Sequence, residues 1–491
     1  MNVSLKNKIV SGLIWRGGGA IGIKILRFII SIILARLLLP KDFGLIAIAT
    51  IFINLGEILI DGGFCDALIQ RKKLTYEESN SVYWFNIFLA ILLYIIIYFF
   101  APIFSSFYNE PQLTNILRII AISPFIGSLT LVPRALIFRY MEFKKLAIIT
   151  WVSLFVGGFA AIILAYTGFG IWALVAEFII SNIIKGIMTV FVVHWKPIFI
   201  FKYNGVKELF NFGYKMLFRN ILYILQTNLN TLFFGKISTM EQTAYYARGY
   251  SYPNLLSNTI DGTFDQVIFS AMSSVQDNPQ KLALIREKGI QLSTFLSFPC
   301  FCLLAIISKE LIPLMLTSKW EPCIPFLQLT CCDALLLNLL CIMRQCFNSI
   351  GRSDITLRLR LYLFSCNGLA LICYTLYHYI FSSQYLSLYK IIIIIIVLNY
   401  SVIFLIFKYS RELLGYSFIM YYSDIKHNFW SACIAMIFCC FIIQKFSYQT
   451  QYMLIFKIFS FSICYIILSL SFHSPAIHIL IDEYKHFLHK K

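Results

Sequence analysis

Long apolar segments recur along this chain from the N-terminal region to about residue 471, and they leave few folds open to it. Each segment holds about 18 to 28 residues, and a helix of about 20 residues crosses the hydrocarbon core of a membrane. Hydrophobic residues make up 59% of the chain and charged residues 13%, whereas about 25% of residues are charged in a soluble domain. The composition therefore excludes an ordinary soluble enzyme and predicts an integral membrane protein.

The apolar segments predict about fourteen transmembrane α-helices, because backbone N–H and C=O groups in lipid must bond within their own segment. They are too long and too continuous for the alternating strands of a membrane β-barrel. The predicted spans cover residues 11–39, 42–68, 81–102, 112–138, 146–166, 169–194, 207–235, 241–272, 286–308, 322–347, 356–380, 386–407, 427–445 and 452–473. We therefore expect an all-α integral membrane protein.

The formal net charge of +18 indicates membrane topology and no nucleic-acid partner, because the basic residues lie in short connections between spans. If the N-terminus is cytoplasmic, roughly 26 Lys and Arg residues fall on the cytoplasmic side and roughly 6 on the other side. Basic residues favour the cytoplasmic side of a membrane protein. Both termini are therefore predicted to be cytoplasmic.

A short internal repeat supports this layout. Asp61–Gly62–Gly63–Phe64 near the end of the second predicted helix recurs as Asp261–Gly262–Thr263–Phe264 near the end of the eighth, about 200 residues later. Six helices separate the copies, so both halves begin on the same face of the membrane, as in parallel transporter repeats. We expect two pseudo-symmetric lobes of six helices in residues 1–200 and 201–413, followed by two additional helices and a cytoplasmic tail in 414–491.

Several ionisable residues lie within the predicted spans, where each would cost about 3 kcal/mol if it faced lipid. Such residues usually face a water-filled cavity or pair with each other. The predicted cationic lining of a cleft, suited to an anionic substrate, consists of Arg16, Lys24, Arg27, Lys215, Arg219 and Arg248. The acids predicted to take part in ion coupling or charge pairing are Glu57, Asp61, Asp261 and Asp265. The alternative is that groups near helix ends, Lys215 among them, extend to lipid headgroups or fix helix register.

The chain lacks the motifs that would indicate chemistry on a substrate. No GxxxxGK[ST], HExxH or GxSxG sequence occurs, and the fourteen cysteines lack the paired CxxC spacing of a metal or redox site. We interpret the cysteines as small buried hydrophobic residues. We therefore expect no catalytic residues, no metal and no cofactor, and hence no enzyme.

Six sequence patterns occur in order along the chain. They are Gly12–Leu13–Ile14–Trp15, the segment from Ala35 to Gly44, Asp61–Gly62–Gly63–Phe64, the segment from Arg134 to Arg139, Ala244–Tyr245–Tyr246–Ala247–Arg248–Gly249–Tyr250, and the segment from Ser349 to Asp354. In these features the chain resembles bacterial polysaccharide exporters of the Wzx type. They form a branch of the multidrug/oligosaccharidyl-lipid/polysaccharide (MOP) exporter superfamily, which includes the MATE drug exporters. Where the family usually has Asn, this chain has Ala247, which leaves the role of Arg248 open.

The resemblance implies two six-helix lobes, often with two added helices, around a cationic central cavity. It implies a flippase that moves undecaprenyl-pyrophosphate-linked oligosaccharide across the bacterial inner membrane by alternating access, for export of O-antigen, capsule or exopolysaccharide. Membrane lipids, a polysaccharide polymerase and a chain-length regulator are the further expected partners. The alternatives are a MATE-like cation-coupled drug exporter, which would need an acidic cavity, and a membrane polysaccharide polymerase or ligase, which would need a large outer loop.

Overall fold

The computed structural model describes residues 3–380, 388–445, 450–479 and 481, and within them the side chains at all positions except 3–17, 212, 263, 266, 337, 378–380, 442–445 and 450–451. Helices form all the regular structure of these residues, and no strand occurs among them. The expected all-α membrane fold is thereby confirmed. The chain divides into two compact units, Met1–Ala244 and Tyr245–Lys491.

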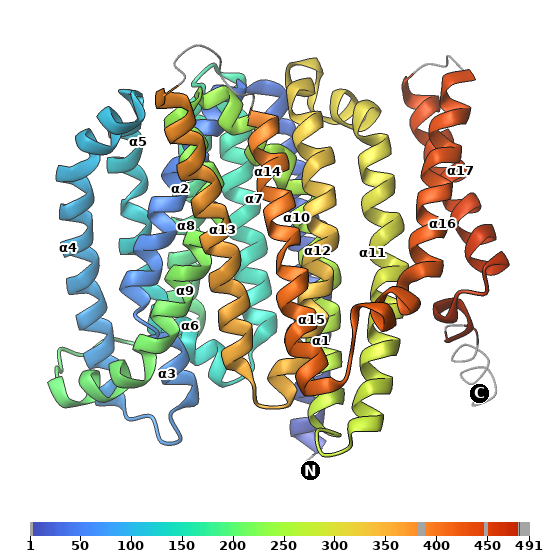
Figure 1. The fold of residues 1–491 in the computed structure, drawn as a ribbon. Helices are drawn as coiled ribbons and strands as arrows, with labels where there is room; N and C mark the ends of the chain where they lie inside the picture. The colour runs from blue at the N-terminus through green and yellow to red at the C-terminus, as the bar shows by residue number, and fades with distance from the viewer. Residues whose placement is uncertain (1–2, 381–387, 446–449, 480, 482–491) are drawn as a thin grey trace. The chain divides into compact units, whose positions relative to one another are not determined.

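The helices are long, and those of each unit run largely side by side (Figure 1). In the first unit they are α1 (Val3–Leu37), α2 (Pro40–Asp61), α3 (Phe64–Gln70), α4 (Tyr76–Tyr108), α5 (Gln112–Ile120), α6 (Ile122–Arg139), α7 (Phe143–Tyr166), α8 (Ile171–Val193) and α9 (Tyr203–Ile237). Next comes α10 (Met240–Ser273), which carries the chain into the second unit. The second unit continues with α11 (Pro279–Leu316), the 3-10 helix η1 (Ser318–Cys323), α12 (Ile324–Ser349), α13 (Ser353–Ile380), α14 (Leu388–Tyr400), α15 (Val402–Leu414), α16 (Phe418–Lys445) and α17 (Thr450–Ser471).

Ten segments of the described residues are long and apolar enough to cross a membrane. The four other predicted spans coincide with α1, α9, α10 and α16, which are 35, 35, 34 and 28 residues long. A total of fourteen crossings stays a prediction. Three predicted spans are interrupted in the structure, since α2 ends at Asp61, α5 ends before Ala121 and α14 ends before Ser401.

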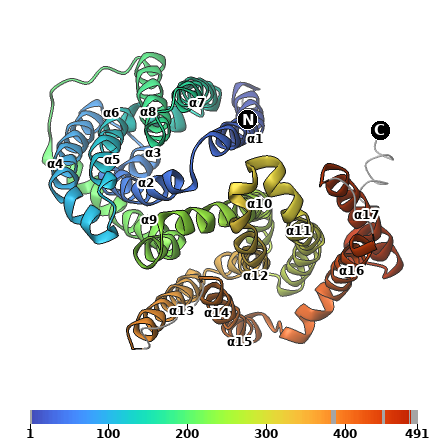
Figure 2. The same ribbon diagram turned by 90° about the horizontal axis from the view of Figure 1, so that it is seen from above.

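The first unit is built on apolar layers between α2, α5 and α8 and between α3, α4 and α6. A further helix, α9, packs against α2, α3 and α4 and so belongs to this unit (Figure 2). At its far end Tyr108 Oη of α4 donates to the carbonyl oxygen of Leu232 at 3.4 Å. The lobe boundaries expected from the internal repeat stay a prediction.

The two copies of the internal repeat differ in backbone conformation. Gly62 and Gly63 have φ angles of 53° and 78°, so α2 stops there and α3 begins at Phe64. A Cβ atom on Gly63 would lie 2.3 Å from the carbonyl oxygen of Gly213 in α9, so two backbones meet at this point. The second copy has Thr263 in place of Gly63, and α10 continues through it without a break. A β-branched residue rarely adopts positive φ, which explains the difference.

In the second unit α11 is the element against which α12, α16 and α17 pack. Apolar side chains of α11, α12, α13, α15, α16 and α17 form its core. Polar groups join α11 to the last two helices. Lys457 Nζ of α17 lies 2.6 Å from Glu310 Oε1 of α11, and the two side chains are only 4% and 15% exposed. This sealed ion pair fixes α17 to α11.

Candidate transport sites within the membrane

A first charge cluster lies within the helices of the first unit. It consists of Arg27 on α1, Glu57 and Asp61 on α2, Arg134 on α6 and Lys185 on α8. Lys185 and Arg134 exert electrostatic attraction on Glu57, Arg134 does so on Asp61, and Arg27 acts on Lys185. The cluster therefore brings together three cations and two carboxylates from four helices.

The packing of α2, α6 and α8 holds the first charge cluster in place. Ser123 Oγ of α6 donates to Glu57 Oε1 at 3.4 Å. The backbone N–H of Cys65, at the start of α3, donates to Asp61 Oδ1 at 3.2 Å because the chain turns at the two glycines. Asp66 of α3 also acts electrostatically on Asp61, so acids and cations are about balanced here, and the three cations are the groups that can bind an anion.

A second charge cluster lies in the second unit and consists of Asp261 and Asp265 on α10 and Arg344 on α12. Arg344 Nη2 is 2.6 Å from Asp265 Oδ2, and both side chains are about 30% exposed. Asp265 Oδ1 also accepts from Gln345 Nε2 at 2.6 Å and from Cys341 Sγ at 2.9 Å. Two carboxylates face one cation here, so the second cluster favours a cation.

The remaining predicted cations lie outside the two charge clusters. Lys24, Lys215 and Arg219 are exposed, as Arg27 of the first charge cluster also is, and among the described residues neither Lys215 nor Arg219 forms an ion pair. Arg248 lies with its guanidinium carbon 5.2 Å from the ring centre of Trp320, a fully buried residue of η1. The side chain of Arg16 falls outside the described residues. The predicted roles of all six cations in substrate binding stay predictions.

Three members of the clusters were not among the predicted site residues: Arg134, Lys185 and Arg344. Arg134 and Arg344 occupy corresponding places in the repeat, at the exits of the fourth and tenth predicted spans. Each lies beside an acid near the repeated motif, Asp61 in one unit and Asp265 in the other. The corresponding positions of the two arginines could have identified them from the sequence. Lys185 could have been identified as a lysine in the middle of a predicted span.

These features define a class of protein, a multi-pass membrane transporter with charged sites inside its helical units. Its fold is that of solved MOP transporters. The lipid II flippase MurJ in an inward closed conformation superposes with a TM-score of 0.75 at 14% identity, over 94% of this chain and 98% of that one. A multidrug resistance MATE transporter in an inward-facing conformation superposes with a TM-score of 0.62 at 13% identity, over 80% of this chain and 94% of that one.

Residues 33–325 match the sequence profile of a family described as polysaccharide biosynthesis protein, and the chain belongs to this family. It is 24% identical over 340 residues to lipopolysaccharide biosynthesis protein WzxC of Escherichia coli K12, an alignment that covers 68% of each protein. It is 26% identical over 335 residues to teichuronic acid biosynthesis protein TuaB of Bacillus subtilis, covering 66% of this chain and 68% of that one. The resemblance drawn from the sequence motifs is thereby confirmed.

Proposed function

We propose that this protein flips a lipid-linked oligosaccharide, carried on undecaprenyl pyrophosphate, across the bacterial inner membrane by alternating access. The observation that carries the proposal is the first charge cluster, which places cations from three helices inside the membrane region of a polysaccharide biosynthesis protein. Sugars and pyrophosphate cannot enter hydrocarbon unaided, so a transporter must replace their water. Cationic side chains inside the helices supply that replacement.

Arg27, Arg134 and Lys185 are the groups we assign to the pyrophosphate. They come from three helices, and the carboxylates of Glu57 and Asp61 compensate their charge while the site is empty. An arriving pyrophosphate would compete with these carboxylates for the cations. Arg16, Lys24, Lys215, Arg219 and Arg248 remain proposed contributors along the substrate path.

The second charge cluster is the proposed site of coupling to a proton or sodium gradient. Arg344 pairs with Asp265, whereas among the described side chains Asp261 accepts one 3.4 Å hydrogen bond, from Asn338 Nδ2. Asp261 is therefore the less tightly held carboxylate, and we assign to it the exchange of a proton or a cation during transport. Binding of that ion would favour one of two transporter conformations.

The proposal includes an orientation and partners. Both termini lie in the cytoplasm, and the protein carries out transport without catalysis. A polysaccharide polymerase and a chain-length regulator act on the flipped product.

The test uses a strain that lacks the gene and expresses Arg27→Ala, Arg134→Ala or Lys185→Ala. We expect loss of surface polysaccharide and accumulation of its lipid-linked precursor at normal protein levels. Lys145→Ala is the matched control, because Lys145 is a partly exposed lysine in the first turn of α7 that pairs with Glu142. Wild-type surface polysaccharide in all three variants at normal protein level would refute the assignment.

The MATE-like drug exporter is the second candidate, and the excess of acid in the second charge cluster is the observation that favours it. Drug susceptibility of the deletion strain separates the two functions, because a flippase deletion leaves it unchanged. A polymerase or ligase would instead alter glycan chain length or attachment while the precursor is still flipped.

A further inference from the structure

The connection between α8 and α9, residues 194–202, is called the strap below. It runs around the outer side of the first unit past α4 (Figure 2). Its backbone is fixed to the first turns of α4 by Asn80 Oδ1 accepting from Ile198 N–H at 2.7 Å, Trp84 Nε1 donating to Ile198 O at 2.9 Å, and Ser81 Oγ accepting from Lys202 N–H at 2.8 Å. The strap is therefore an ordered element although it contains no helix.

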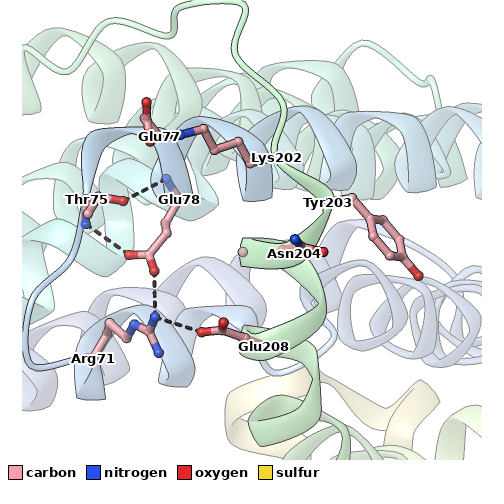
Figure 3. Close-up of a pocket in the computed structure, with 9 residues that line it drawn as sticks. Arg71, Thr75, Glu77, Glu78, Lys202, Tyr203, Asn204 and Glu208 are labelled. Atoms are coloured by element: carbon pink, nitrogen blue, oxygen red, sulfur yellow. Dashed lines mark hydrogen bonds and ion pairs between the residues drawn. The ribbon is translucent and has the colours of Figure 1, made fainter.

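Ion pairs fix the end of the strap and the start of α9 (Figure 3). Arg71 Nη2 lies 2.8 Å from Glu78 Oε1 and 2.9 Å from Glu208 Oε2, and Lys202 pairs with Glu77. These residues line a cavity of about 410 Å³. Carboxylates already neutralise both of its cations, so this cavity is not an anion-binding site.

The length of α4 sets the depth of the strap in the membrane. Its 33 residues rise about 50 Å, about 20 Å more than the hydrocarbon core. Several residues at each end of α4 therefore stand at the level of the lipid headgroups. The strap bonds to residues 80–84, within the first three turns of α4, and so runs along the boundary between the headgroups and the hydrocarbon core.

The outward side chains of the strap combine large apolar groups with lysines. Phe199 is 82% exposed, Ile198 and Phe201 are half exposed, and Lys196 is exposed. Lys207, in the second turn of α9 directly after the strap, is also exposed. Trp84 of α4 packs beside Phe199 with ring centres 5.1 Å apart. Aromatic side chains and lysines together are typical of segments that bind the interface of an anionic membrane.

We propose that the strap, together with Lys207 of α9, is a lipid-binding surface for anionic phospholipids of the cytoplasmic leaflet. Phe199, Ile198 and Phe201 insert below the headgroups, and Lys196 and Lys207 contact the lipid phosphates. This proposal rests on the orientation given under the proposed function, with the α8–α9 connection in the cytoplasm. It does not depend on what the protein transports. Failure of the lipid-binding test would therefore leave the transport proposal intact, and failure of the transport test would leave the lipid-binding proposal intact.

The test measures hydrogen–deuterium exchange of the strap in the full-length protein, reconstituted in nanodiscs of phosphatidylcholine alone or with 30% phosphatidylglycerol. A lysine at an anionic surface strengthens binding by about fivefold. We therefore expect slower exchange with phosphatidylglycerol, and loss of that difference at high salt in the unmodified protein. Lys196→Gln combined with Lys207→Gln should abolish the difference. Lys309→Gln combined with Lys390→Gln, which removes two exposed lysines predicted to lie on the opposite side, should preserve it.

Equal exchange of the strap in the two lipid mixtures would overturn the proposal. Protection that persists at high salt and in the strap double variant would also overturn it, because apolar insertion alone would then suffice. Protection in native membrane vesicles but not in phosphatidylglycerol nanodiscs would assign this surface to a protein partner instead.

Discussion

Arg344 Nη2 lies 2.6 Å from Asp265 Oδ2, and this ion pair distinguishes two acids that stand one helical turn apart on α10. Asp265 is also bonded to Gln345 and Cys341, so each of its oxygens has a close donor. Asp261 has a single 3.4 Å contact with Asn338 among its described side-chain hydrogen bonds. We infer that Asp265 holds α10 to α12 and that Asp261 is the acid available for ion exchange.

The two acids should therefore respond differently to amide substitution. Asp261→Asn should abolish ion-dependent transport with little change in stability. Asp265→Asn should lower the free energy of unfolding by about 1.5–3 kcal/mol, the range for hydrogen bonds to charged groups. Thermal melting of the detergent-purified protein and surface polysaccharide in complemented cells measure the two effects. Equal melting temperatures for the two variants would contradict this division of roles.

Lys457 and Glu310 should behave as a buried ion pair whose partners depend on each other for stability. Removing one partner of a buried ion pair costs about 3–5 kcal/mol, because the other charge is left without compensation. Lys457→Met alone should therefore lower the melting temperature strongly. Lys457→Met combined with Glu310→Met should recover most of the loss, because no charge then remains buried. A double variant no more stable than Lys457→Met would show that the pair does not act as a unit.

The two repeated motifs provide two contrasting glycine substitutions, at the third position of the first copy and the second position of the second copy. Gly63→Ala should destabilise the protein, because the left-handed conformation costs a residue with a side chain about 1–2 kcal/mol and the added Cβ would meet Gly213. Gly262→Ala should be neutral or stabilising, since Gly262 lies within α10 with open space around it and alanine favours helix. Melting temperatures of the two variants decide the matter. Similar values would mean that the turn at Gly63 is not required.

Glu57 provides a test of charge balance in the first charge cluster. Glu57→Gln leaves Lys185 and Arg134 less compensated, so protein level and export should both fall. Glu57→Gln combined with Lys185→Gln keeps the net charge and should restore the protein level, while export stays low because a substrate cation is missing. Immunoblots and surface polysaccharide assays separate these outcomes. Full export by the double variant would remove Lys185 from the proposed site.

Features that depend on local sequence could be predicted, and those that depend on packing could not. The spans follow from apolar length, and the spacing of Glu57 and Asp61 places them on one face of a helix. The partners of these acids, Arg134 and Lys185, lie on helices far along the chain, and only packing brings them close. Arg248 was predicted as a cleft cation, and its position over Trp320 depends on the fold of η1.

The membership of α9 in the first unit bears on how the protein is made. A ribosome that has synthesised the first 200 residues has released α2, α3 and α4 with a surface that α9 has yet to cover. The N-terminal half therefore completes its packing only when about 40 further residues have emerged and inserted. Separately expressed halves should accordingly reassemble better when the chain is divided after Ser238, between α9 and α10, than when it is divided after residue 200.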